Sequence, residues 1–575
     1  MASSGIWFST REKTILHQQG VSIPNQSDLD QALAELAEAN RKSVGISVGQ
    51  RIQLTEQCLQ SLSAAAEEWV TLSCQAKRLS AGTPVCAEEV LAGPVSVARF
   101  LQVLLRSLKA IARSGKPRLP GAPVFTTTHQ WRGPVFPTSG IYDVLVFAGL
   151  QAEVWLKPGV ESETLFDLDC LNRPIAESMP LTLVLGAGNV SAIPATDVLT
   201  KILQDGERVL LKMNPVNAYL KPVFERAFHP LIAAGLLRIV TGNVAAGEYL
   251  VTHSDIDRIH ITGSTQTHDA IVWGSDPLER ESRKAKQQPL IDVPITSELG
   301  NVSPWIVVPG AYSDKQLRFQ AENIAASIVN NASFNCLATK VIITSADWPQ
   351  RDRFLAMIEQ QLEQIPRRYA YYPGAAERWE RFTGEVPEDK EYLPWKLIRN
   401  ADPRQSPHLF QEESFVCVCA ETALEADSET DFLERAVDFV NQEVWGTLCA
   451  TMTVPDSFRK TESTVLDNCI SRLQYGAVGI NHWPALNYAF MSTPWGGAPG
   501  ADLTNVQSGI GNVHNTYFLS DVEKTVLYGP LTLFPKPVWF PSHPNPEAVG
   551  WGLMHLYCQP SLMNLTRVGL SVVFK

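Results

Sequence analysis

The stretch Leu181–Lys212 reads LTLVLGAGNVSAIPATDVLTKILQDGERVLLK, and this stretch decides the fold. A short apolar run is followed by Gly-Ala-Gly-Asn, a helical stretch and a second apolar run that ends at Lys212. Two more apolar runs follow in the same rhythm, at Arg238–Thr241 and Arg258–Thr262. Short strands that alternate with helices are typical of parallel βαβ units, so we expect a doubly wound α/β fold. Ligands of such sheets bind beyond the carboxyl ends of the strands.

The chain has 575 residues, enough for two to four domains, and we expect five parts along it. In order, these are a helical N-terminal part, a β-rich arm, the α/β domain of the opening stretch, a second α/β domain and a C-terminal segment. Their predicted bounds are 1–120, 121–180, 181–297, 298–510 and 511–575.

Apolar spacing predicts helices over Arg51–Arg78 and Val95–Arg113 in the N-terminal part. The arm carries three strand-like pieces broken by Gly and Pro, and we expect it to make subunit contacts. These pieces are Val124–Trp131, Tyr142–Phe147 and Glu153–Leu156. The C-terminal segment is rich in Pro and aromatic residues and ends in a strand-like run at Gly569–Phe574.

The composition indicates a globular protein that binds neither nucleic acid nor an anionic membrane, because the net charge is −12 and only 19% of residues are charged. No apolar run approaches the roughly 20 residues that span a bilayer. The N-terminal residues do not resemble a secretory signal. The ten cysteines show no CxxC pair and no spacing typical of a metal site, so we expect free thiols in a reducing cytoplasm.

Cys336 is the cysteine with a candidate chemical role. It follows a helix for which Ser313 and Gln316 form a predicted capping box, and it precedes an apolar strand. A second motif, Ser297-Glu298-Leu-Gly, lies earlier in the chain, separated from Cys336 by a strand and a helix. A thiol and a carboxylate in one cleft are the minimum equipment for covalent acyl chemistry. Any single cysteine is more often structural, so this role needs independent support.

Several strand ends carry polar residues that permit two interpretations. Gly186-Ala-Gly188-Asn189 is close to a dinucleotide fingerprint, but the next strand ends in Lys212 instead of an acidic residue. Spacing alone favours a tight turn slightly over an Asn189 amide that stabilises an oxyanion. Lys212 is either an extended strand-end lysine or a ribose ligand. Gly242 lies at a strand end too, and Gly263-Ser264 forms either a helix cap or a phosphate site.

Eight segments, in order, resemble the aldehyde dehydrogenase superfamily. The likeness covers residues 180–515 well and the N-terminal helices loosely. The segments are Val209–Lys212, Gly235–Gly242, Ile261–Ser264, Ser297–Gly300, Asn335–Ala338, Glu412–Phe415, Tyr475–Asn481 and Pro494–Gly497.

The resemblance implies roles for the matching residues. Cys336 would be the nucleophile, Glu298 the base and Asn189 the oxyanion amide. A second set would bind NAD or NADP in a Rossmann-like domain over 181–297, completed by the N-terminal helices: Lys212, Gly242, Gly263, Ser264, Glu413 and Phe415. Pro215 stands where many NAD enzymes of the family carry Glu, which slightly favours tolerance of NADP. Residues 298–510 would form the catalytic thiol domain, and the arm would support a homo-oligomer.

Departures from the family pattern leave three functions open. Ala187-Gly188 before Asn189 resembles the fatty-acyl-CoA reductase branch, and His268 and Asn301 replace family glycines. The first hypothesis is NAD(P)-dependent oxidation of an aldehyde to a carboxylic acid. The second is reduction of an acyl-CoA, so the small-molecule partner is an aldehyde or an acyl thioester. The third is a degenerate family member that acts as a binding protein.

Overall fold

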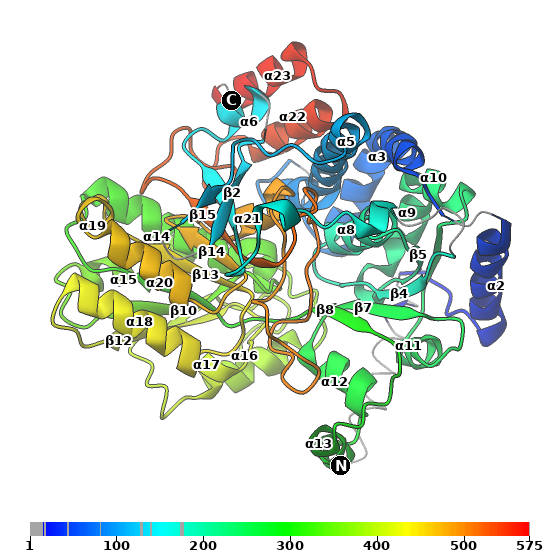
Figure 1. Cartoon of the computed structure of the whole chain (residues 1–575). Coiled ribbons are helices and arrows are strands. Elements are labelled where there is room, and N and C mark those ends of the chain that lie inside the picture. The colour runs from blue at the N-terminus through cyan, green and yellow to red at the C-terminus, as the bar shows by residue number, and fades with distance from the viewer. Residues whose placement is uncertain are drawn as a thin grey trace.

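The computed structural model describes residues 15–16, 19–42, 45–80, 82–126, 130–138, 141–172 and 178–573. Two sheets organise this part of the chain (Figure 1). The five-stranded sheet has the order β6-β5-β4-β7-β8, and every neighbouring pair is parallel. Its strands are β4 (Leu181–Leu185), β5 (Arg208–Lys212), β6 (Leu237–Val240), β7 (Arg258–Thr262) and β8 (Ile295–Glu298). The α/β fold predicted from the opening stretch is confirmed.

Alternation along the strands explains why helices cover both faces of this sheet. Val184 and Leu211 pack into a core with the N-terminal helices, whereas Leu183 and Leu210 belong to a second core on the other face. The helices and helical turns of this half are α2 (Gln26–Lys42), α3 (Val48–Ala76), α4 (Cys86–Val90), η1 (Leu91–Val95), α5 (Ser96–Ser114), α8 (Ala192–Leu199), η3 (Thr200–Gln204), η4 (Pro215–Leu220), α9 (Lys221–Ala227), α10 (His229–Ala233), α11 (Val244–Val251), α12 (Thr265–Trp273) and α13 (Pro277–Lys286). The helices predicted over Arg51–Arg78 and Val95–Arg113 are present as α3 and α5.

The second sheet has ten strands in the order β1-β2-β3-β15-β14-β13-β9-β10-β12-β11. The strands from β15 to β11 are parallel to their neighbours, and β1, β2 and β3 add antiparallel pairs at one side. The strands are β1 (Val124–Phe125), β2 (Trp131–Phe136), β3 (Gln151–Leu156), β9 (Ser303–Val307), β10 (Thr339–Ser345), β11 (Lys396–Ile398), β12 (Val418–Leu424), β13 (Cys449–Thr453), β14 (Ala477–Ile480) and β15 (Val522–Tyr528). The β-rich arm therefore continues the second sheet of its own chain.

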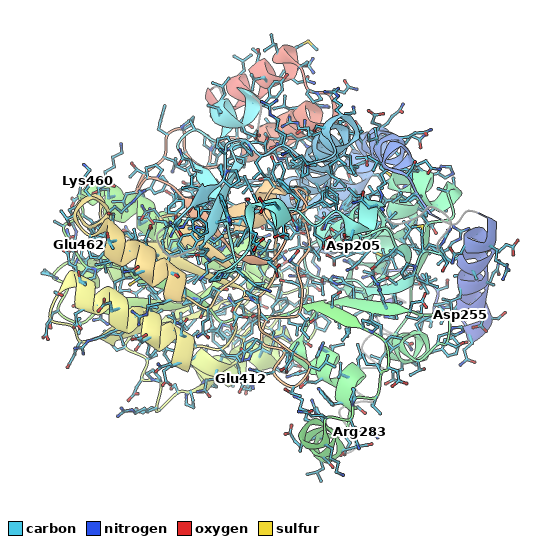
Figure 2. The ribbon with its side chains drawn as sticks, in the orientation of Figure 1. Asp205, Asp255, Arg283, Glu412, Lys460 and Glu462 are labelled. Carbon is cyan, nitrogen blue, oxygen red and sulfur yellow. A yellow bond between two sulfur atoms is a disulfide. The ribbon has the colours of Figure 1, made fainter. Side chains whose placement is uncertain are left out.

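The predicted capping box at the start of α14 is confirmed, because Ser313 and Gln316 satisfy each other's backbone N–H groups. The remaining helical elements are α6 (Ile141–Val146), η2 (Ser162–Thr164), α7 (Asp169–Asn172), α14 (Asp314–Val329), η5 (Asn330–Ser333), α15 (Arg351–Gln364), α16 (Ala375–Thr383), α17 (His408–Gln411), α18 (Glu429–Glu443), α19 (Asp456–Thr461), α20 (Ser463–Arg472), α21 (Ala485–Phe490), α22 (Pro546–Cys558) and α23 (Leu562–Val573). Charged side chains such as Asp255, Arg283 and Lys460 lie at the periphery (Figure 2). No helix in the described ranges is both long and apolar enough to cross a bilayer.

Two predicted strands are helices. The Tyr142–Phe147 piece forms α6, because buried Asp143 accepts hydrogen bonds from Thr138 and forms an ion pair with Arg99 at 2.7 Å. This tertiary pairing outweighs local β-propensity. The run at Gly569–Phe574 belongs to α23 up to Val573, and Phe574 lies outside the described residues. Leu565, Val568 and Val572 face the core from α23 at helical spacing, a period that the short apolar run concealed.

One pair of cysteines departs from the expectation of free thiols. Cys74 near the end of α3 and Cys86 at the start of α4 form a disulfide. The other cysteines are free, and five of them are buried as expected for core residues: Cys58, Cys417, Cys419, Cys449 and Cys469. Cys170, Cys336 and Cys558 are partly exposed.

Candidate functional site

Cys336 lies in a loop of unusual backbone conformation between η5 and β10. Asn331, Ala332 and Ser333 all have positive φ angles, of 51°, 54° and 67°. Non-glycine residues adopt such angles only when their surroundings enforce them, and they concentrate at functional sites. Buried Lys340 enforces this loop, since its Nζ donates to the Ser333 hydroxyl at 2.8 Å and to the Val416 carbonyl at 2.8 Å.

The thiol meets a carboxylate that comes from the other sheet. Glu298 is the last residue of β8, and its Oε1 lies 3.5 Å from Cys336 Sγ. The indole N–H of Trp495 donates to the same oxygen at 3.3 Å. The pairing predicted from sequence is thus present at the junction between the two α/β units.

Burial controls the ionisation of both groups. It raises the pKa of Glu298 to about 8; the Trp495 hydrogen bond opposes this change, and the negative charge of Asp197 adds to it. Burial also raises the pKa of the Cys336 thiol, and the neighbouring Glu298 charge raises it further. At neutral pH the resting thiol is therefore protonated, and it needs a proton acceptor before it can act as a nucleophile.

Asp197 belongs to a buried polar cluster on the side of Glu298 that faces α8. Its Oδ2 accepts a hydrogen bond from Thr262 at 2.9 Å and lies 3.6 Å from His260 Nε2. Thr262 is the register partner of Glu298 in the β7–β8 pair. The cluster places the Asp197 carboxylate close enough to Glu298 to raise the pKa of Glu298.

Asn189 is fixed beside the thiol loop. Its side-chain amide donates to the Phe334 carbonyl at 3.1 Å, two residues before Cys336. Its main-chain carbonyl accepts from Lys77 Nζ at 3.2 Å, from Asn331 at 3.1 Å and from the Tyr371 hydroxyl at 2.9 Å. One side-chain contact and three main-chain contacts thus fix residue 189 beside the loop that carries Cys336.

Glu413 and Phe415 approach the same loop from another direction. Glu413 Oε1 accepts from the Asn301 N–H at 3.2 Å, and a Cβ at residue 300 would overlap the carboxylate. Gly300 is therefore required for this contact. Burial raises the pKa of Glu413 to about 7, opposed by the positive charge of Lys340. The Phe415 ring lies 6.0 Å from the Phe334 ring.

The strand-end residues predicted to bind a cofactor lie along the edge of the five-stranded sheet at which its parallel strands end. The Gly263 N–H donates to the Glu298 carbonyl at 3.1 Å, and Ser264 caps α12 by accepting from the Thr267 N–H at 3.2 Å. Lys212 ends β5, and Gly242 follows the end of β6. A Cβ atom on residue 242 would lie 3.5 Å from Lys212 Cε. Lys212 and Gly242 are therefore neighbours at one end of this edge, and Gly263 and Ser264 lie at the end nearer the thiol.

The first turn of α12 fits an anionic group. Two polar atoms there, Thr265 Oγ1 and His268 Nε2, are buried and have no hydrogen-bond partner among the residues that the structure describes. Helix N-terminal N–H groups attract phosphate oxygens. His268 stands where the family pattern has Gly, and its imidazole supplies a hydrogen-bonding group in place of open space. The residues present are compatible with the diphosphate of a dinucleotide.

Three residues of the site were missed by sequence reasoning. Trp495, the second residue of the Pro494–Gly497 motif, contacts the base, Lys340 supports the thiol loop, and Asp197 adds the second carboxylate. The motif was a usable signal for Trp495. Asp197 lies on α8, whereas Asn189 lies in the turn before that helix, so no helical spacing links the two in the sequence.

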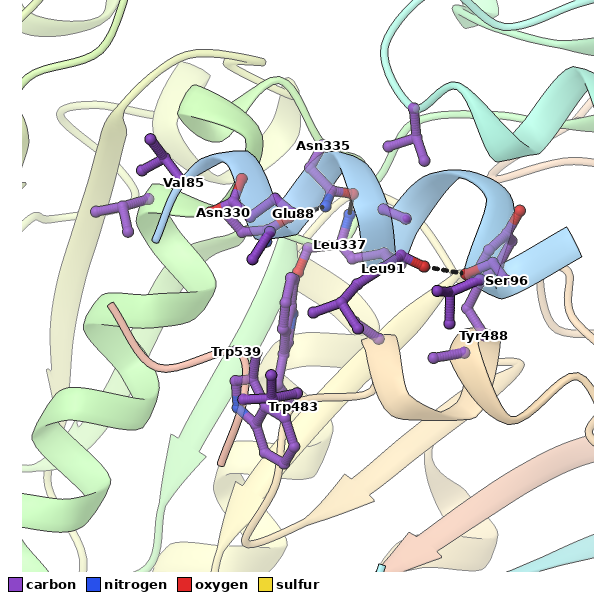
Figure 3. Close-up of a pocket in the computed structure, with 18 of the residues that line it drawn as sticks. Val85, Glu88, Leu91, Ser96, Asn330, Asn335, Leu337, Trp483, Tyr488 and Trp539 are labelled. Carbon is purple, nitrogen blue, oxygen red and sulfur yellow. Dashed lines mark hydrogen bonds between the residues drawn. The ribbon is translucent and has the colours of Figure 1, made fainter. Parts of the chain in front are cut away.

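A cavity of about 520 Å³ ends at the thiol and the base. Its walls include Leu91 of η1, Leu337 beside the thiol and the rings of Trp483 and Trp539, which lie together in Figure 3. The Trp483 indole donates to the Leu337 carbonyl at 2.7 Å, which couples this wall to the thiol loop. A small molecule in this chamber would reach Cys336 Sγ.

Comparisons with known proteins relate the chain to one enzyme family. The sequence model of the Aldehyde dehydrogenase family matches residues 183–369. The chain is 27% identical over 172 residues to 4-trimethylaminobutyraldehyde dehydrogenase of Rattus norvegicus, which is 29% of this chain and 31% of that protein. It is 35% identical over 115 residues to the mitochondrial benzaldehyde dehydrogenase of Antirrhinum majus, 19% of each chain. These alignments span about a third or less of the curated relatives.

Solved structures match over a much greater length. A crystal structure of indole-3-acetaldehyde dehydrogenase in complex with NAD+ superposes with a TM-score of 0.59 at 17% identity, covering 89% of this chain and 90% of that one. NADP-dependent glyceraldehyde-3-phosphate dehydrogenase from Bacillus halodurans, complexed with NADP, gives 0.57 at 17% identity and covers 88% and 92%. At these identities the superpositions establish a shared fold.

Proposed function

We propose that this chain, a member of the aldehyde dehydrogenase superfamily, oxidises an aldehyde to a carboxylic acid with NAD or NADP. The observation that carries the proposal is the 3.5 Å contact between Cys336 Sγ and Glu298 Oε1 at the end of the chamber. Asn189 supports it through its bond to Phe334 of the thiol loop, and Gly263 supports it through its bond to the Glu298 carbonyl.

The first half of the reaction forms a covalent adduct. Glu298 accepts the thiol proton, and the Cys336 sulfur adds to the carbonyl carbon to give a thiohemiacetal. The Asn189 amide donates to the carbonyl oxygen as it gains negative charge, together with a main-chain N–H of the thiol loop. The bound nicotinamide would accept the hydride and leave a thioester on Cys336. Glu413 and Phe415 would hold its ribose and ring, and Lys212, Gly242, Gly263 and Ser264 would contact the rest of the dinucleotide.

The second half releases the acid. Glu298 first releases the thiol proton to solvent and then takes a proton from water, whose oxygen attacks the thioester carbon and displaces the Cys336 thiolate. The thiolate recovers a proton, so one aldehyde, one water and one oxidised cofactor give one acid, one reduced cofactor and one proton. Glu298 thus acts twice from a single position next to the sulfur.

Pre-steady-state measurement of the reduced-cofactor band, over a broad panel of aldehydes with NAD and NADP, tests the proposal. A burst equal to the concentration of Cys336 sites is expected with the correct pair. Absence of turnover over the whole panel would contradict the oxidation. If a thiol probe also fails to label Cys336 selectively, the hypothesis of a degenerate family member that acts as a binding protein would be favoured.

Reduction of an acyl-CoA is the alternative, and one observation favours it. With a pKa of about 8, Glu298 is mostly protonated at pH 7 and activates water poorly, which leaves the thioester exposed to another thiol. NADPH consumption that depends on acyl-CoA and releases aldehyde would establish this route. Independence of the rate from coenzyme A excludes it.

Asn189→Ala is expected to lower kcat/KM by roughly 10²–10³-fold, the usual cost of losing one oxyanion donor. The main-chain contacts of residue 189 persist, so the loop retains its position. The alkylation rate of Cys336 by iodoacetamide should therefore stay near wild type. Equal losses in alkylation and turnover would indicate a general disturbance of the thiol loop instead.

The pH profile of kcat is expected to rise through about pH 8, because Glu298 must be deprotonated to activate water and its pKa is raised to about 8. Asp197→Asn removes a negative charge that raises this pKa, so the rising limb should move to lower pH. Steady-state rates from pH 6 to 10 measure the limb. Asp255→Asn, an exposed carboxylate far from the site, is the control and should leave it unchanged. An unmoved limb in Asp197→Asn would assign it to another group.

The subunit contact predicted for the arm is a further part of the proposal. β1 forms one edge of the ten-stranded sheet and exposes Val124 by 61% and Phe125 by 50%. An apolar edge strand is a template for pairing with another chain. Light scattering of the purified protein should show a homo-oligomer, and Val124→Lys should weaken it.

A further inference from the structure

The chamber at Cys336 is built for a hydrophobic substrate. Its walls come from several separate segments of the chain, and the aliphatic or aromatic side chains on them include Leu91, Ile193, Leu337, Trp483, Trp539 and Leu553. We infer that it binds aldehydes with an extended apolar chain, alkyl or aryl-alkyl, and that the C-terminal segment sets the length it accepts. This inference rests on the proposed function and names its substrate class.

The lining of the chamber is predominantly apolar, although polar side chains such as Glu88, Asn330 and Ser96 contribute to it (Figure 3). At the inner end are the thiol, Glu298 and Asp197, where the reacting carbonyl must lie. At the outer end, exposed Arg78 and Arg367 mark the mouth. A predominantly apolar lining has few groups that could solvate a charge, and burial of an unpaired charge is strongly unfavourable.

Two of the cationic side chains that could attract an anionic substrate already form ion pairs within the protein. Arg78 binds Glu391 at 3.0 Å, and Arg368 binds Glu88 at 2.7 Å. The Asp197 carboxylate at the inner end would repel a phosphate or a second carboxylate on the substrate. The charge distribution thus disfavours short anionic aldehydes and permits neutral chains.

The C-terminal segment forms one side of the chamber through Val538, Trp539, Phe540, Leu553 and Tyr557. It is anchored to α14, because the Trp539 indole donates to Asn323 at 3.3 Å and Lys536 binds Glu322 at 3.3 Å. The helix α22 packs closely on the opposite wall: a Cβ at Gly550 would lie 3.0 Å from Val90 Cγ1. The distance between these two walls is therefore fixed by packing.

The opposite wall has an irregular turn at the chamber. The π-helical segment η1 contains Gly93, with φ −118° and ψ −118°, followed by Pro94. The Ser96 hydroxyl donates to the Leu91 carbonyl at 2.8 Å, as the dashed line in Figure 3 shows. Such turns are frequent at functional sites. Here the turn directs Leu91, Ala92 and Val95 to the cavity.

An n-alkanal series from propanal to dodecanal tests the substrate class. Burial of each methylene should raise kcat/KM about fourfold until the chain fills the chamber. Glyceraldehyde 3-phosphate and 4-trimethylaminobutyraldehyde serve as anionic and cationic comparisons, and both should be poor substrates. A flat alkanal series would overturn the inference, and so would a preference for the quaternary ammonium aldehyde bound by the aromatic rings.

Leu553→Trp tests the role of the C-terminal segment, because it fills the chamber from α22. The preferred chain should become shorter by several methylenes. His555→Trp places the same ring on the exposed face of α22 and should change nothing. Ala92→Leu, a smaller change on the opposite wall, should also shorten the optimum. Equal effects of Leu553→Trp and His555→Trp would refute the assignment of the wall.

Binding without catalysis separates this inference from the proposed reaction. The Cys336→Ser protein should be stabilised against heat by decan-1-ol and not by propan-1-ol or choline, and Leu553→Trp in that background should abolish the stabilisation. Decan-1-ol binding without any aldehyde turnover would leave the chamber assignment standing and refute the oxidation. Turnover of polar aldehydes without decan-1-ol binding would refute the chamber assignment and leave the oxidation standing.

Discussion

Cys336→Ala is expected to reduce turnover to below roughly one-thousandth of wild type, because no other group can form the covalent adduct. The side chain is small and only partly buried, so the fold and nucleotide binding should persist. Steady-state formation of reduced cofactor measures the first effect, and quenching of tryptophan fluorescence by NAD or NADP measures the second.

The matched control is Cys469→Ala, which removes a free and fully buried thiol on α20 outside the site. This variant should retain wild-type turnover per folded molecule, even if it is less stable. Mass spectrometry after a brief exposure to aldehyde and cofactor should find an acyl adduct on the wild-type protein. It should find none on Cys336→Ala. Near-normal turnover by Cys336→Ala would refute covalent catalysis at this residue.

Glu298→Gln should separate the two halves of the reaction. The amide cannot accept a proton from water, so the steady rate should fall by roughly 10²–10⁴-fold. The burst of reduced cofactor should persist at full amplitude when the assay is run above pH 9, where more of the thiol ionises without help from the base. Glutamine keeps an oxygen for the Trp495 N–H, so the packing around residue 298 is retained.

An added nucleophile provides the control for this variant. Hydroxylamine attacks a thioester directly, so it should accelerate the steady rate of Glu298→Gln and leave Cys336→Ala inactive. Parallel loss of the burst and the steady rate, without rescue by hydroxylamine, would assign Glu298 to the first half alone.

The sheet around the opening stretch could be predicted because its signals are local. The strands β4 to β7 are short runs rich in apolar residues, and polar residues stand at or just beyond their carboxyl ends. The contact between Cys336 and Glu298 was accessible through motif spacing and family resemblance. In contrast, α6 depends on the Arg99–Asp143 ion pair, a contact between separate elements that local propensity cannot reveal.

The missed site residues share this property. Lys340 supports the thiol loop by reaching Val416, and Trp495 reaches Glu298 across the junction of the two sheets. No local sequence pattern indicates the contact that either Lys340 or Trp495 makes. Each role arises because two segments that are distant in the sequence meet in the folded chain. The Cys74–Cys86 disulfide was likewise hidden among scattered cysteines, since no spacing rule distinguished this pair.

The position of β15 between β3 and β14 has a consequence for synthesis of the protein. The Tyr528 hydroxyl bonds to Glu153 at 3.0 Å, and these residues are 375 positions apart in the chain. At roughly 5–20 residues per second, the arm would wait about 20–75 seconds on the ribosome before its partner strand emerges. Its apolar edge is exposed throughout that interval, so the nascent chain should depend on chaperones, and termination before Val522 should yield aggregates.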